Sequence, residues 1–156
     1  MLRDRADSEA DHRRFIERAI AAETVWALKG DSGFAFCESN EAGGKDVIVF
    51  WSDRAYAERA RKSEFAEYEP HALSLFDFLF RWLPGMSRDG VLAGTNWTGA
   101  LIGIESDPKE LQDQITDRMP KAMLERYVEE LRRGLADQSP GGTGGDGGVS
   151  AADPEN

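Results

Sequence analysis

The chain has 156 residues, of which 40% are hydrophobic and 31% are charged, a composition that favours one globular domain with its own core. Its net charge is −10, and the basic residues are interspersed with acidic ones. Affinity for a phosphate backbone comes mainly from clustered Lys and Arg, so this charge pattern disfavours nucleic-acid binding.

The cytoplasm is the expected compartment. The opening residues, MLRDRADSEADHRR, lack the apolar stretch of a secretory signal. The longest apolar runs, such as residues 47–51, are too short to span a bilayer, so no membrane association is expected. The single cysteine, Cys37, cannot form an internal disulfide, which fits a reducing environment.

The first predicted helix covers residues 8–22, where apolar side chains recur at helical spacing. Three strands are predicted next. Residues 24–28 and 34–37 flank a Gly-rich turn and indicate a hairpin, and a second Gly-rich turn leads into the apolar run 47–51. Short turns between successive strands predict an antiparallel meander.

A second helix is predicted over residues 54–63. Ser52 or Asp53 is expected to cap it by accepting hydrogen bonds from its first free amides. Residues 68–71 are predicted to be a loop, because Pro70 disfavours helix in the residue before it.

A capping-box variant then begins the next helix, with Ser74 followed three residues later by Asp77. This helix is expected to run to about Leu83 and to be stopped by the Pro84-Gly85 pair.

The last part of the predicted domain is a hairpin and a helix. Residues 91–95 and 100–104 flank the turn 96–99, which indicates a second pair of strands. Asp107 is a predicted N-cap and Pro108 fits the first helical position, so another helix should begin there.

The element order predicts an α+β domain, in which helices cover an antiparallel sheet of about five strands. We assign this domain to residues 1–117. A helical extension is predicted over 118–137, with its helix at 121–135. The Gly-rich, acidic segment 138–156 has too little apolar surface to offset ordering and is predicted to be a disordered tail.

Four motifs carry a family resemblance: FWSDRAYAERA, WLPGM, DGVLAGTNW and DPKEL. Together they resemble the bacterial family named domain of unknown function 2750, over roughly residues 12–117. A weaker likeness is to the SseB N-terminal-like domains. The resemblance implies a fold and supplies no catalytic residues, because no activity is established for the family.

We predict no metal site, no cofactor and no catalytic residues. The chain has two histidines and one cysteine, with neither Cys-x-x-Cys nor His-Glu-x-x-His. His12 is interpreted as lying on an exposed helix face. Cys37 lies in a β-run and is interpreted as a small core residue rather than a nucleophile.

Trp97 is the first candidate for a ligand or partner surface. It is predicted at a hairpin tip between Asn96 and Thr98, where it either folds back onto the core or is exposed on a binding surface. A pocket near this hairpin would also use Tyr68 and His71.

Phe76 and Phe80 are the second candidate. They lie four residues apart, outside the main apolar stripe of their helix, and form a possible homodimer face. The other three tryptophans, Trp26, Trp51 and Trp82, are expected to be core residues.

The favoured hypothesis is a non-enzymatic protein–protein interaction module, of adaptor or immunity type. Its partner would be an unidentified protein, for which a basic surface is one option. One alternative is a small-molecule-binding protein or enzyme with a pocket near residues 95–98. The other is a homodimeric structural module.

Overall fold

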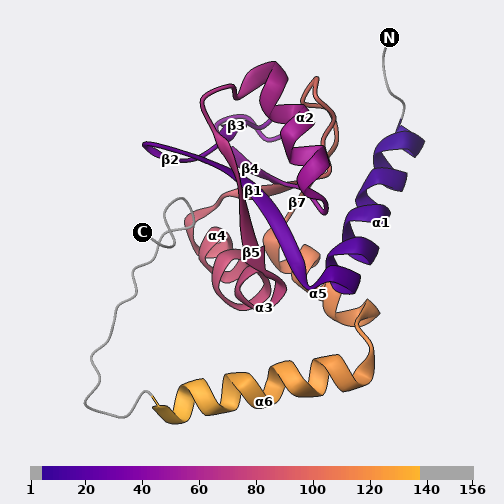
Figure 1. The fold of residues 1–156 in the computed structure, drawn as a ribbon, viewed down its shortest axis with the longest axis vertical. Coiled ribbons are helices and arrows are strands. Elements are labelled where there is room, and N and C mark those ends of the chain that lie inside the picture. Colours follow the sequence, from indigo (N-terminus) through magenta and orange to yellow (C-terminus); the bar gives the residue numbers. More distant parts are fainter. Residues whose placement is uncertain (1–4, 138–156) are drawn as a thin grey trace.

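The computed structural model describes residues 5–137 (Figure 1). Its helices are α1 (Arg5–Ala22), α2 (Arg54–Glu64), α3 (Leu75–Asp77), the π-helical segment η1 (Phe78–Trp82), α4 (Leu83–Asp89), α5 (Pro108–Arg118) and α6 (Lys121–Asp137). Its strands are β1 (Thr24–Gly30), β2 (Gly33–Phe34), β3 (Phe36–Glu38), β4 (Asp46–Phe50), β5 (Glu69–Ser74), β6 (Leu92–Thr95) and β7 (Ile104–Ser106). The α+β class is confirmed.

The strands form two sheets rather than one meander. One sheet has the order β2-β1-β5, and the other has the order β3-β4-β6-β7. All neighbours are antiparallel except β4 and β6, which are parallel. The sheets meet where Trp26 and Trp51 exchange two backbone hydrogen bonds of 2.8 Å each.

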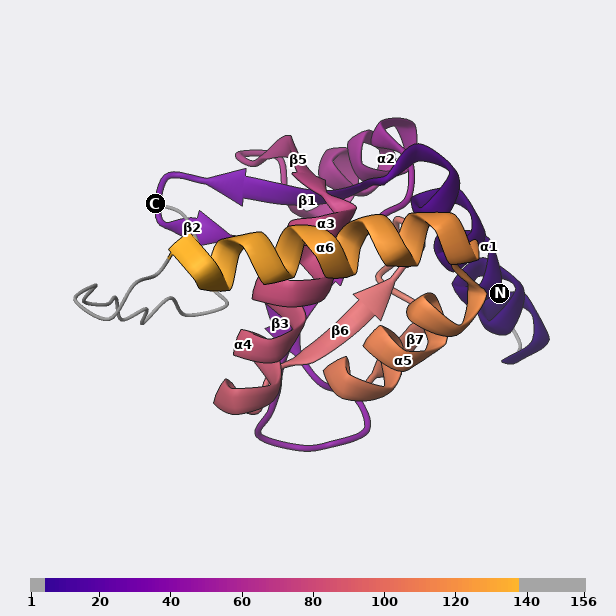
Figure 2. The same ribbon diagram turned by 90° about the horizontal axis from the view of Figure 1, so that it is seen from below.

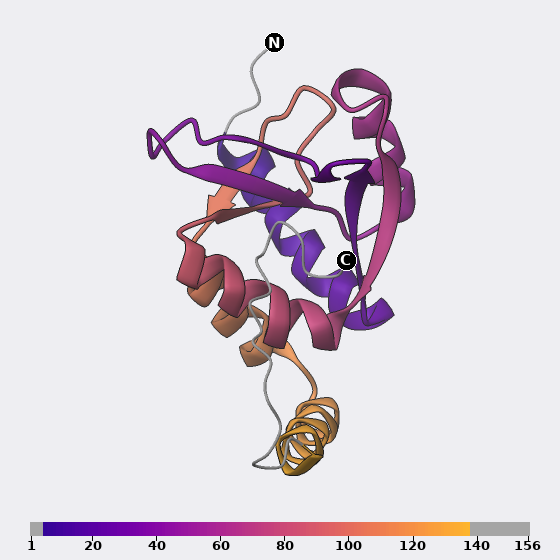
Figure 3. The same ribbon diagram turned by 90° about the vertical axis from the view of Figure 1, so that its left-hand side faces the viewer.

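Strand β4 is central because both of its faces are buried. Ile48 and Phe50 pack into a core against α1, the α3–η1–α4 segment and α5. Val47, Val49 and Trp51 pack into a second core beneath α2. Figure 3 shows the α3–α4 segment on one side of the strands and α2 at the other. A strand buried on both faces reads as a continuous apolar run, as the sequence of β4 does.

The predicted loop at residues 68–71 is wrong, because Glu69–Ser74 is a strand. It pairs along its whole length with β1, from Thr24 opposite Ser74 to Lys29 opposite Glu69. Pro70 is tolerated since β5 lies at the edge of its sheet, where a missing backbone donor costs no ladder hydrogen bond on the open side.

The predicted helix stop at Pro84 is also wrong. The chain passes through η1, whose wider turn is closed by the Leu83 amide donating to the Phe78 carbonyl, and continues as α4. Pro84 lies in the first turn of α4, where a proline is tolerated. The helix ends at Gly90, which has a left-handed φ of 74°.

Two of the three predicted caps are confirmed. Ser74 accepts a 3.0 Å hydrogen bond from the Asp77 amide. Asp107 accepts 3.1 Å bonds from the second and third amides of α5. Asp53 is the N-cap residue of α2 but its side chain makes no capping bond. Its two carboxylate oxygens instead accept bonds of 2.8 Å each from Arg18 on α1.

The predicted C-terminal helix is present as α6, which lies across the α3 end of the body (Figure 2). The predicted tail, 138–156, lies outside the described residues, and the division at residue 117 stays a prediction. Within the described part of the chain, no helix is both long enough and apolar enough to cross a membrane.

Candidate functional site

The candidate site is a pocket of about 240 Å³ where α1, α2 and the loop after β6 meet. We call it the Arg14–Arg59 pocket. Its lining residues are Asp11 and Arg14 from α1, Tyr56 and Arg59 from α2, and Asn96, Trp97, Thr98 and Gly99 from the loop. Three of the sequence candidates, Asn96, Trp97 and Thr98, therefore lie together on one wall.

Asn96 holds this wall in place. It is buried and has a left-handed φ of 49°, a conformation that asparagine tolerates better than most residues. Its side-chain oxygen accepts a 2.8 Å bond from the Ser52 amide, and its side-chain amide donates to the Ser52 hydroxyl at 3.1 Å. The same amide lies 3.4 Å from the Asp11 carbonyl. Asn96 thus joins the end of β4 to α1.

Trp97 is a core residue, only 4% exposed, and not an exposed hairpin tip. Its indole N–H donates to the Ile104 carbonyl at 2.8 Å, and its own carbonyl accepts the Trp51 indole N–H at 3.0 Å. Gly94 and Gly103 make room for the ring. A methyl group at Gly94 would lie 2.6 Å from the indole, well inside van der Waals contact.

The charges at the pocket favour an anion. Two arginines and one aspartate line it, in a chain whose net charge is −10. Arg14 contacts Asp11 at 2.7 Å. Arg59 makes no ion pair among the described residues, and its guanidinium lies over the Tyr56 ring at 5.4 Å. A guanidinium held against a ring keeps its donors available for a ligand.

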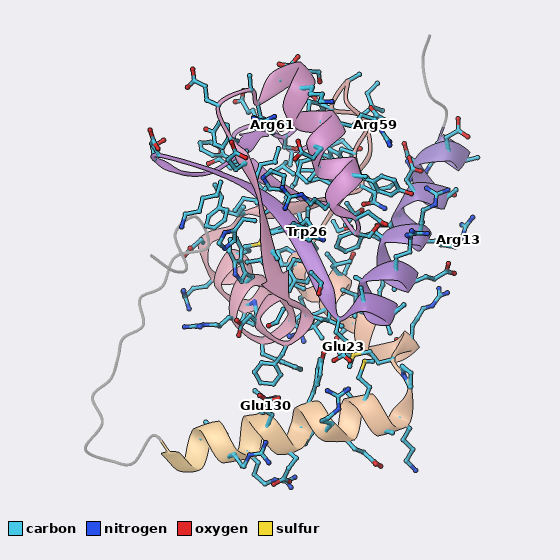
Figure 4. The ribbon with its side chains drawn as sticks, viewed as in Figure 1. Arg13, Glu23, Trp26, Arg59, Arg61 and Glu130 are labelled. Atoms are coloured by element: carbon cyan, nitrogen blue, oxygen red, sulfur yellow. The ribbon has the colours of Figure 1, made fainter. Side chains whose placement is uncertain are left out.

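Figure 4 shows that neighbouring arginines on α1 and α2 point in different directions. Arg59 and Arg61 extend to different sides of α2, and Arg13 lies on the outer side of α1. Arg61 donates to the Tyr68 carbonyl and contacts Glu69, so it belongs to the β5 side of the helix. Arg59 is directed to the pocket side, between α2 and α1.

A second ion pair supports the base of α1 near the pocket. Arg18 and the carboxylate of Asp53 make a bidentate contact, and this contact holds the pKa of Asp53 below its ordinary value. The Ser52 hydroxyl donates to the same carboxylate at 2.7 Å. The motif residues around Asp53 therefore tie α1 to the start of α2.

His12 links three elements, a role that the sequence does not predict. It is half-buried rather than exposed, with Nδ1 at 2.7 Å from the Thr95 hydroxyl and Nε2 at 2.8 Å from the Gln114 side-chain oxygen. The ring joins α1 to β6 and α5. The spacing in α1 could have indicated this position, since His12 precedes the buried Ile16 by four residues and therefore lies on the same face of the helix.

Tyr68 and His71 do not line the Arg14–Arg59 pocket. The Tyr68 ring packs edge-on against Phe65 and lies over Gly30. His71 packs edge-on against Phe34. Its surroundings include a separate cavity of about 140 Å³, beside Asp77, Arg81 and Trp82. β5 carries both candidates away from residues 96–98.

Phe76 and Phe80 contact each other and α6. Their rings lie 5.2 Å apart, and Tyr127 of α6 packs edge-on against them at 5.4 and 6.3 Å. The Tyr127 hydroxyl donates to Glu23 at 2.7 Å, which lowers the pKa of that carboxyl. The possible homodimer face is thus covered in part by the chain's own C-terminal helix.

The remaining reactive side chains form no cluster. Across residues 5–137, no group of three or more His, Cys, Asp or Glu side chains is placed to hold a metal ion. Cys37 is half-buried, and burial raises the pKa of its thiol, which weakens it as a nucleophile.

Comparison with known proteins places the chain in a family. A comparison with curated proteins gives no match. The family model described as "Protein of unknown function (DUF2750)" matches residues 12–115, which include the part of α1 from His12 onward, both sheets and most of α5. Since the match covers well over half of its length, the chain belongs to the DUF2750 family.

Proposed function

We propose that this protein binds a small anion, with a carboxylate or phosphate group, in the Arg14–Arg59 pocket. The observation that carries the proposal is the placement of Arg59. Among the described residues it makes no ion pair, and its guanidinium is positioned by Tyr56 beside a pocket of about 240 Å³.

The pocket is small and hydrogen bonds hold its wall in place, which suits a compact ligand. A guanidinium provides planar donors that match two oxygens of a carboxylate or phosphate. Arg14 can supply a second set if it turns from Asp11, and it is 42% exposed in its side chain. The wall of Asn96 and Trp97 is buried and hydrogen-bonded, so little ordering is needed on binding.

This proposal corresponds to the small-molecule alternative of the sequence interpretation. It leaves out Tyr68 and His71, which line no part of the pocket. The interaction-module hypothesis stays a prediction, as does its basic protein partner.

Binding can be tested by calorimetric titration with inorganic phosphate and with succinate. The wild-type chain should bind at least one of these probes saturably. Arg59→Gln should weaken that binding by about tenfold or more, since a charge-assisted hydrogen bond contributes about 1.5–3 kcal/mol.

Arg13→Gln is the matched control. It removes the same charge from α1 one residue before Arg14, but on the outer side of the helix (Figure 4). The affinity of this variant should stay near the wild-type value. Equal losses in the two variants, or no saturable binding by the wild type, would contradict the proposal.

A further inference from the structure

Helix α6 carries an apolar stripe whose inner end packs on the body and whose outer members, Val128 and Leu135, are exposed. We call it the α6 stripe, and it consists of Leu124, Val128, Leu131 and Leu135. Val128 is 41% exposed and Leu135 is 70% exposed. The contacts of α6 with the body come from Tyr127, which is only 3% exposed, from Met123 and Leu124, which are half-buried against the main core, and from the pairing of Arg126 with Glu23.

The spacing of the α6 stripe is that of a coiled-coil seam. Its members are separated by four, three and four residues, which places them at alternating a and d positions of a heptad. A groove of about 480 Å³ follows the same side of the helix, where Leu124 and Val128 are flanked by charged residues.

The charged residues that flank the seam indicate a second copy of the chain as the partner and an antiparallel orientation of the two helices. In this heptad Glu125 and Arg132 occupy the two e positions, whereas the g positions are Tyr127 and Gly134. A parallel pair of α6 helices would bring e against g and form no ion pair. An antiparallel pair brings e against e, so Glu125 of each copy meets Arg132 of the other, twice by symmetry.

The chain itself offers no other occupant of matching chemistry. Residues 138–156, which follow α6, contain a single bulky aliphatic, Val149. They cannot supply a second stripe.

We propose that two copies of this chain associate through an antiparallel pair of α6 helices, with the α6 stripe as the seam. Helix α6 has 17 residues, or about 25 Å of length, enough for the four layers of the stripe. This interface differs from the Phe76/Phe80 face, which Tyr127 of the same chain occupies. It is independent of anion binding.

Sedimentation equilibrium of the full chain tests the proposal. The wild type should form dimers, and Glu125→Arg or Arg132→Glu alone should weaken dimerisation by about tenfold, since each turns two attractive contacts into repulsive ones. The double variant Glu125→Arg/Arg132→Glu restores the pairing and should dimerise like the wild type.

Arg133→Glu is the matched control, because it makes the same charge change at the exposed f position. Its dimerisation should be unchanged. Circular dichroism of each variant checks that the helix content is kept. A wild-type chain that remains monomeric at every concentration would overturn the proposal, and so would a dimer that is insensitive to both single charge swaps.

Discussion

The wall of the Arg14–Arg59 pocket and the outer face of α6 differ in how they are supported. At the pocket, Asn96 and Trp97 are at most 5% exposed, and both side chains are hydrogen-bonded to other segments. On α6, Val128 and Leu135 are exposed, and only one side of the helix contacts the body. A rigid wall suits a small ligand, whereas an uncovered stripe suits a macromolecular partner.

The largest expected effect is the loss of stability in a variant that disrupts the pocket wall. Trp97→Ala removes a buried indole and its packing contacts, so it should lower the free energy of unfolding by about 3–5 kcal/mol. Leu135→Ala, measured in dilute solution, should change it by about 0.5 kcal/mol or less, because the side chain is exposed. Urea unfolding measures both. Similar losses of unfolding free energy in the two variants would contradict the contrast between a buried pocket wall and an exposed face of α6.

A smaller effect is expected from the polar link in the same wall. Asn96→Ala leaves the buried Ser52 amide without its acceptor, which should cost about 1–3 kcal/mol of unfolding free energy. Ser52→Ala keeps the Asn96 acceptor for the Ser52 amide and removes only a hydroxyl, so it should lose less. Urea unfolding of the two variants separates the hydrogen bond from the general effect of substitution, and an equal loss would show that the acceptor is unimportant.

The smallest effect concerns the ion pair that joins α1 to α2. The pKa of Asp53 is lowered in the folded chain, so its contribution to stability is fully present above the ordinary aspartate range and is lost as pH falls through the folded pKa. The stability difference between the wild type and Arg18→Gln should therefore be constant near neutral pH and shrink in acid. A difference that grows in acid would contradict this assignment.

The sequence predicted the local features of the fold well. The caps at Ser74 and Asp107 depend on hydrogen bonds spanning two or three residues, and both are present. The end of α1 at Ala22 and the position of α6 follow from apolar periodicity alone, whereas α1 begins at Arg5, three residues before its predicted start. Signals of this kind need no knowledge of the rest of the chain.

Features that depend on distant segments were missed. Pro70 alone predicts a loop, but the edge position of β5 makes a proline acceptable in this strand. The position of Asp53 before α2 predicts a capping side chain, but Arg18, 35 residues earlier, binds its carboxylate. The division into two sheets depends on the pairing of β4 with β6, which no local pattern shows.

The candidate site also combines residues that local sequence predicts with residues that depend on distant segments. Asn96, Trp97 and Thr98 were found from their place in a turn, and they do line one wall of the pocket. Arg14 and Arg59 were missed, because their approach depends on how α1 and α2 pack across the loop. An arginine on an exposed helix face carries no local sign of what lies opposite.

A nuclear magnetic resonance titration with inorganic phosphate and succinate tests the central claim most directly, by following the side chains of Arg14 and Arg59 together with the Thr98 amide. We expect saturable shifts at these three positions at a common midpoint, with the α6 residues unaffected. Shifts that are absent, or that appear equally at Arg13 and Arg133 without saturation, would contradict the assignment of the Arg14–Arg59 pocket as an anion site.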